Sequence, residues 1–107
     1  MLNSPQTLGE DDLPHRLDEA RARDAARTAA ITGRLRVSRR AESQLEDEGR
    51  PVPHVEHAMR TATGAESIEP PECWRLTGGT SLDGERLVVE IEIEESVVRV
   101  LSVTTER

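Results

Sequence analysis

The clearest chemical pattern in the sequence is a set of three glutamates in one strand-like stretch. Glu90, Glu92 and Glu94 alternate with other residues, so on a β-strand their carboxylates would share one face at a spacing of about 7 Å. Such a row can bind a divalent cation or position a catalytic acid, although it more often forms a solvated face. It can also dock a basic partner, because like charges repel and gain most when arginines arrive opposite them.

Four arginines are candidates for phosphate recognition, because a guanidinium fork matches phosphate oxygens. They are Arg39, Arg40, Arg75 and Arg99. Arg39 and Arg40 begin a predicted helix, where backbone N–H groups also favour an anion. Arg99 is expected to pair with Glu92 across a hairpin. Surface salt bridges explain these arginines equally well, so both interpretations stay open.

The remaining reactive side chains do not form a recognisable site. His54 and His57 are three residues apart, but no further ligand is spaced to complete a zinc or iron site. We therefore expect two solvated histidines, no metal and no cofactor. Cys73 is the only cysteine, which excludes a disulfide within the chain. Trp74, the only aromatic residue, is predicted to be the largest piece of the core.

The segment 86–104 carries the glutamates and is predicted to form a β-hairpin, because its hydrophobic residues recur with a period of two. With the loop at Glu95-Ser96, the predicted register contains the pairs Ile91–Val100, Glu92–Arg99 and Ile93–Val98. This register places three further hydrophobic residues on the acidic face, namely Val88, Leu101 and Val103. The loop lacks an Asn-Gly or Asp-Gly turn, so a slip of one residue stays open, and it would turn the second strand over.

Helices and strands are predicted to precede the hairpin, in an order typical of an α+β domain. They are a helix over 13–32, a strand over 34–37, helices over 39–48 and about 51–62, an edge strand over 66–69, a strand over 73–77 and a glycine-rich turn over 78–84. The order is therefore a helix, a strand, two helices and a three- to four-strand antiparallel sheet, and the helices are expected to lie on one face of that sheet. We divide the chain into a flexible lead-in (1–12), an Ala-rich helical extension (13–33) and an α+β domain (34–107).

Composition limits the class of function. The chain has 107 residues, no Phe or Tyr, and a net charge of -7 from 14 basic and 21 acidic side chains. One small aliphatic core is therefore expected. The acidic balance argues against a general nucleic-acid binder and favours a basic protein partner. The sequence contains neither a signal-peptide pattern nor a stretch long enough to span a bilayer, which predicts a cytoplasmic protein that does not bind a membrane.

Six short motifs follow one another along the chain: Val37-Ser-Arg-Arg-Ala41, Gly49, Val55-Glu-His-Ala58, Trp74-Arg75, Asp83-Gly84 and Val100-Leu-Ser-Val-Thr104. In this order the chain resembles a small bacterial domain family of unknown function that is grouped with the RelE-, BrnT- and MqsR-like toxins. The resemblance covers roughly two thirds of the chain. It implies a RelE/MqsR-like α+β fold, a toxin–antitoxin or related system with a cognate partner protein, and metal-independent cleavage of messenger RNA. It also marks Arg40 and Arg75 as candidate catalytic residues that bind phosphate.

The sequence departs from the family pattern where that chemistry would occur. Arg40 stands at the family's His, Gln44 and Glu48 stand at usually basic positions, and Thr104 replaces a terminal Tyr. A guanidinium does not shuttle protons near neutral pH. The alternative is therefore a catalytically degenerate copy of the fold that acts as an acidic protein-binding module, such as a regulator, an immunity-like factor or an adaptor. Its partner-binding residues would be Glu90, Glu92, Glu94 and Arg99.

The two hypotheses imply different partners, and the sequence does not decide between them. The toxin hypothesis predicts RNA as substrate and an antitoxin as protein partner. The binding-module hypothesis predicts a protein with a basic surface, and a second copy of the chain is a further candidate. Whether the protein is an enzyme is therefore left open at this level.

Overall fold

The computed structural model describes residues 19–68, 72–95 and 97–106. These residues form three helices and five strands, namely α2 (Glu19–Thr32), β1 (Leu35–Val37), α3 (Arg39–Glu48), α4 (Val52–Thr61), β2 (Gly64–Ser67), β3 (Cys73–Thr80), β4 (Arg86–Ile93) and β5 (Val98–Thr105). The strands make one sheet in the order β1-β5-β4-β3-β2. The predicted α+β class is confirmed. The predicted lead-in and the start of the first helix, at residues 1–18, lie outside the described residues.

Local sequence signals account for the helix boundaries between residues 38 and 52. The Ser38 hydroxyl accepts a hydrogen bond from the Ala41 N–H at 3.1 Å and caps α3, as short polar side chains do at helix starts. Gly49 ends α3 in the left-handed region, at φ 64°, which a glycine adopts without strain. α4 then begins with Val52 and Pro53, and a proline in a first turn loses no intrahelical hydrogen bond.

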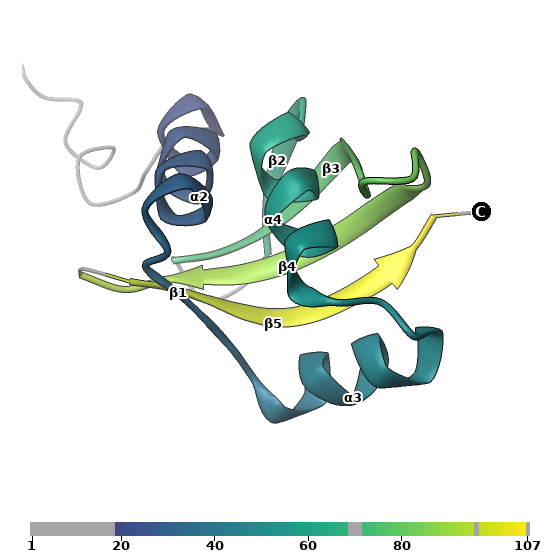
Figure 1. Ribbon diagram of the computed structural model, residues 1–107. Coiled ribbons are helices and arrows are strands. Elements are labelled where there is room, and N and C mark those ends of the chain that lie inside the picture. The colour runs from purple at the N-terminus through teal and green to yellow at the C-terminus, as the bar shows by residue number, and fades with distance from the viewer. Residues whose placement is uncertain (1–18, 69–71, 96, 107) are drawn as a thin grey trace, which may run out of the picture.

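The core lies between the sheet and the helices α2 and α4, which sit side by side over one sheet face (Figure 1). Alternating residues of β3, β4 and β5 point into it, with Leu76, Ile91 and Val100 each at most 1 % exposed. α2 contributes Ala22 and Ala26 to the same core. The predicted helical extension and the predicted α+β domain therefore share one hydrophobic core.

α3 has a different position from the other two helices, because it lies beside the part of β5 that continues beyond its pairing with β1 (Figure 1). The Ser38 hydroxyl donates to the Leu101 carbonyl at 3.1 Å, and the Gln44 side-chain oxygen accepts from the Val103 N–H at 2.7 Å. These contacts satisfy backbone groups that an open sheet edge would leave available for pairing. The expected arrangement of the helices on one sheet face is confirmed for α2 and α4. α3 differs in lying beside β5, although its Ala41 and Leu45 are buried in the same core.

The predicted hairpin is present, and its register is confirmed near the loop. Ile93 pairs with Val98, Ile91 with Val100 and Glu92 with Arg99. Beyond that point the register shifts, because Glu90 faces Ser102 and leaves Leu101 as the extra residue of a β-bulge,. The bulge turns Val103 into the core, where it pairs with Val89 and is 5 % exposed. The prediction that Val103 lies on the acidic face is therefore wrong.

Three further strand predictions need correction. β1 joins the sheet parallel to β5, with Leu35 beside Val98 and Val37 beside Val100, so the sheet is mixed and has five strands. The predicted strand over 73–77 continues to Thr80 through a register shift between Leu76 and Gly79. The predicted glycine-rich turn over 78–84 therefore begins in a strand. The edge strand β2 lies two residues earlier than its prediction.

We predict that Gly79→Ala destabilises the protein, because Gly79 is the point where α4 approaches the sheet. A Cβ at Gly79 would lie 2.1 Å from the Ala58 carbonyl oxygen, and α4 would have to move. Overpacking of this kind costs about 2–3 kcal/mol, and urea denaturation would measure the loss. Gly84→Ala is the control, because its φ of 91° is unfavourable but nothing lies within 4 Å of its Cβ. A smaller loss for Gly79→Ala than for Gly84→Ala would contradict the packing argument.

Candidate functional site

The sheet face opposite α2 and α4 carries most of the predicted site residues, and we call it the outer face. Residues opposite one another on adjacent strands point to the same side. One row across this face is Glu66–Arg75–Glu90–Ser102, and the next is Cys73–Glu92–Arg99–Arg36. Among the described elements, α2 and α4 pack on the other face and α3 lies at the β5 edge. No helix within the described residues covers the outer face.

Arg75 is the centre of a closed polar network on the outer face. Its Nε and one terminal nitrogen both donate to Glu90 at 3.1 Å, and its other terminal nitrogen donates to Glu66 at 3.3 Å. The Ser102 hydroxyl donates to the second Glu90 oxygen at 3.1 Å. The hydrogen bond with Glu90, followed by that with Glu66, raises the pKa of Arg75 above its ordinary value. A phosphate would have to displace two carboxylates to reach this guanidinium.

The predicted pairing of Arg99 with Glu92 holds for the backbone but not for the side chains. Glu92 and Arg99 are Cα neighbours, but the Arg99 guanidinium bonds to Glu94 at 3.2 Å. A long side chain can reach the diagonal neighbour on the next strand. The Glu92 carboxylate consequently has no ion pair among the described residues. Of the three predicted docking glutamates, it is the one available to a partner without breaking an internal contact.

Arg40 and Arg75, the two predicted catalytic residues, are not brought together. Arg40 is exposed in the first turn of α3, beside the β5 edge. Arg75 lies on β3, and β4 separates β3 from β5. Two strand spacings alone amount to about 10 Å. The Arg40 side chain has no hydrogen-bonding partner among the described residues, so it is exposed for binding but stands apart from Arg75.

Arg50 is the centre of a cluster of ion pairs that no pattern in the sequence had indicated. It lies between α3 and α4 with a side chain only 10 % exposed, and it forms ion pairs with Glu48 at 3.3 Å, with Asp83 at 3.6 Å and with Glu85. The hydrogen bond with Glu85 is the main cause of the raised pKa of Arg50, and burial opposes it. Thr105 also donates to Glu48, at 2.9 Å. Arg50 therefore ties the helix connection to the β3–β4 turn and supports the fold.

His54 and His57, which were predicted to be solvated, instead contact the β3–β4 turn. The Nδ1 atom of His57 lies 2.7 Å from the Thr80 carbonyl oxygen, and the Nδ1 atom of His54 accepts from the Leu82 N–H at 3.2 Å. The expectation that they are merely solvated is corrected, because the turn folds back onto α4. No group of three or more His, Cys, Asp or Glu side chains in the described part of the chain could hold a metal ion.

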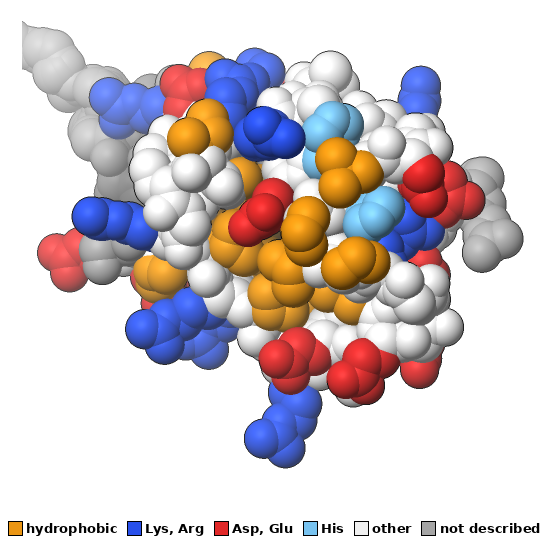
Figure 2. All heavy atoms as spheres, in the orientation of Figure 1, with side chains coloured by type: hydrophobic (Ala, Val, Ile, Leu, Met, Phe, Trp, Pro, Cys, Tyr) orange, Lys and Arg blue, Asp and Glu red, His pale blue; other side chains and the backbone are white. Residues whose placement is uncertain are grey.

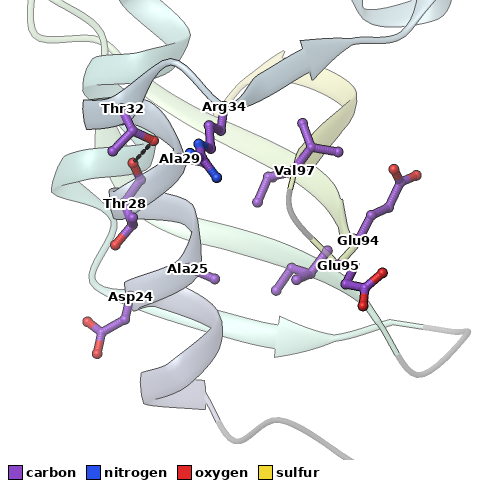
Figure 3. Close-up of a pocket in the computed structure, with 11 residues that line it drawn as sticks. Asp24, Ala25, Thr28, Ala29, Thr32, Arg34, Glu94, Glu95 and Val97 are labelled. Carbon is purple, nitrogen blue, oxygen red and sulfur yellow. Dashed lines mark hydrogen bonds between the residues drawn. The ribbon is translucent and has the colours of Figure 1, made fainter.

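A groove of about 350 Å³ lies between α2 and the tip of the β4–β5 hairpin (Figure 3). The small α2 residues Ala25, Thr28 and Ala29 form one wall, and the hairpin end forms the other. Glu94 and Glu95 stand on the hairpin side, across the groove from α2 (Figure 3). The groove therefore adjoins the outer face through Glu94. Its described lining contains no His, Cys or Ser, and its ionisable groups are Asp24, Arg34, Glu94 and Glu95.

The β3–β4 turn should make stability depend on pH, because the pKa of Asp83 is lowered there. The main cause is a hydrogen bond from the Ser81 hydroxyl, and the Glu85 backbone and the charges of Arg50 and His54 act in the same direction. A lowered folded-state pKa adds stability above the unfolded value of about 3.9, and this stability is lost as the pH falls through the folded value.

We therefore predict that Asp83→Asn lowers Tm at neutral pH. The difference from wild type should shrink as the pH falls below about 4, and thermal unfolding followed by circular dichroism would measure it. Asp47→Asn is the control, because Asp47 is an exposed α3 carboxylate with no ion pair among the described residues. An Asp83→Asn deficit that stays constant down to the lowest pH would contradict the assignment.

Comparisons with known protein families, curated proteins and solved structures found no match to the chain. No protein-family model matches the chain, and neither the curated proteins nor the solved structures give a significant match. No helix in the described ranges is long and apolar enough to cross a membrane.

Proposed function

We propose that this protein is a non-catalytic protein-binding module that docks a basic segment of its partner on the outer face. The observation that supports it best is the row of Glu90 and Glu92 on β4, continued by Glu94 just beyond the end of the strand, on a sheet face that no described helix covers. Such a module would act as a regulator, an immunity-like factor or an adaptor. Its partner could be the other member of a toxin–antitoxin pair, as the family resemblance implies.

The geometry of the row suits an extended basic segment. Alternate residues of β4 are about 7 Å apart, which is also the spacing of alternate side chains in a partner strand. Arginines with a period of two could meet the three carboxylates in register. Glu92 is unpaired among the described residues, whereas Glu90 and Glu94 share arginines with the fold. We therefore expect Glu92 to make the first contact and its two neighbours to add to it.

Catalysis on RNA is less well supported by the side chains. Metal-independent cleavage needs groups that accept and donate protons near neutral pH. The chain contains no Tyr and no Lys, and His54 and His57 are engaged with the β3–β4 turn. Arg75 is occupied by two carboxylates. These contacts leave neither described histidine available for proton transfer beside Arg40.

Docking on the outer face can be tested with a synthetic peptide in which Arg and Thr alternate. Changing Glu90, Glu92 and Glu94 to Gln should weaken binding about tenfold, because three exposed ion pairs of about 0.5 kcal/mol each are lost. Glu92→Gln alone should weaken it about twofold and leaves both internal ion pairs intact. Isothermal titration calorimetry would measure the affinities, with Asp47→Asn as the matched protein control.

The peptide also needs a control of its own. A peptide of the same composition with its arginines clustered at one end should bind more weakly, because it cannot match the spacing of the row. Equal affinity of the two peptides, or an affinity that the three Gln substitutions leave unchanged, would refute docking on the outer face.

An RNA-acting toxin remains the second candidate, because one observation favours it. Arg34, Arg36, Arg39 and Arg40 follow one another around β1 and the start of α3, and none has an ion pair among the described residues. Arg36 also lies beside Arg99 on the outer face. Exposed arginines gathered in this way attract phosphate. This basic corner is where RNA would bind if the protein acts on it.

We predict that the purified protein does not cleave messenger RNA, because both described histidines are engaged with the β3–β4 turn and Arg75 is held by two carboxylates. Incubation with messenger RNA followed by gel electrophoresis would show the same intact RNA for wild type and Arg40→Ala. Cleavage by the wild type that Arg40→Ala abolishes would overturn the non-catalytic proposal and establish the toxin alternative.

A further inference from the structure

A second groove, of about 460 Å³, lies between α3 and α4. Leu45, Pro51 and Val52 supply its hydrophobic lining, and Gly49 exposes backbone at its end. Figure 2 shows hydrophobic side chains gathered in the middle of this face of the molecule, over α4 and toward α3, with acidic side chains along the α3 margin. A hydrophobic patch with a charged rim is the usual form of a protein-binding surface.

The rim charges define the kind of partner. Glu42 and Glu46 line the groove one helical turn apart on α3, and neither has an ion pair among the described residues. Arg50 also lines the groove, but its charge is matched by Glu48, Asp83 and Glu85. The groove therefore presents two available carboxylates beside an apolar floor.

We propose that this groove binds an amphipathic helix of a partner protein, one that presents a Leu-type side chain flanked by Lys or Arg. The apolar side chain would lie against Leu45 and Val52. The basic side chains would meet Glu42 and Glu46, which have the i, i+4 spacing of neighbours on one helix face. Helix binding in a groove uses such recurring apolar anchors. This surface is distinct from the outer face and does not depend on the docking proposed there.

The test uses a synthetic amphipathic peptide of Leu, Ala and Lys whose leucines recur every three to four residues. The double change Glu42→Gln and Glu46→Gln should weaken its binding about fivefold, because two exposed ion pairs are lost. Val52→Thr should also weaken binding, because it places a hydroxyl in the apolar floor while keeping the shape of the side chain. A peptide with Glu in place of Lys should show no binding, and high salt should reduce the affinity of the Lys peptide.

Controls separate this groove from the outer face. Glu92→Gln and Asp47→Asn should leave binding of the amphipathic peptide unchanged, and the Glu42/Glu46 variant should still bind the Arg-Thr peptide. Nuclear magnetic resonance should show peptide-induced shifts at Leu45 and Val52. Shifts confined to the outer face, or equal binding of the Lys and Glu peptides, would overturn the proposal. A dimer that the groove variants abolish would show that a second copy occupies the groove, and it would also overturn the proposal.

Discussion

The pairing of Ile91 with Val100 in the middle of the β4–β5 hairpin is the contact on which the rest of the structure depends. Both side chains are completely buried, and they set which face of the hairpin turns toward α2 and α4. β1 extends the sheet along β5 from this point, with Val37 beside Val100. Ser38 then hydrogen-bonds the Val100 carbonyl at 2.9 Å and starts α3 along the same edge. This buried pair therefore lies where the sheet meets the helices α2 and α4, and it is next to the point where β1 and α3 join β5.

The core has to be closed with small aliphatic side chains, since Trp74 is the only aromatic residue. α2 contributes alanines, whose small side chains permit close approach but bury little area each. α4 approaches β3 so closely that only a glycine fits at position 79. The hydrogen bonds of His54 and His57 hold the β3–β4 turn against α4. Close backbone contact in this protein takes the place of the large side chains that fill other cores.

Internal ion pairs determine which charges remain for partners. Arg75, Arg99 and Arg50 are each neutralised by carboxylates within the fold. Among the described carboxylates without ion pairs are Glu92 on the outer face and Glu42 and Glu46 beside the groove. Arg34, Arg36, Arg39 and Arg40, which also lack described ion pairs, lie around β1 and the start of α3. Both proposed docking surfaces consequently call for basic partners, and the basic corner provides a separate place for an anion.

Sequence periodicity and capping signals were sufficient to predict the α+β class, the limits of α3 and the hairpin register near its loop. These features depend on neighbours in the chain or on a period of two. Only the tertiary structure decided the parallel pairing of β1 with β5, the bulge at Leu101 and the inward turn of Val103. It also decided that Arg75 is neutralised by carboxylates of neighbouring strands and that Arg99 forms its ion pair with Glu94. Only the tertiary structure brings Arg50 together with the β3–β4 turn. These outcomes depend on which side chains meet across the sheet, and residues far apart in the chain leave no local pattern that would reveal such meetings.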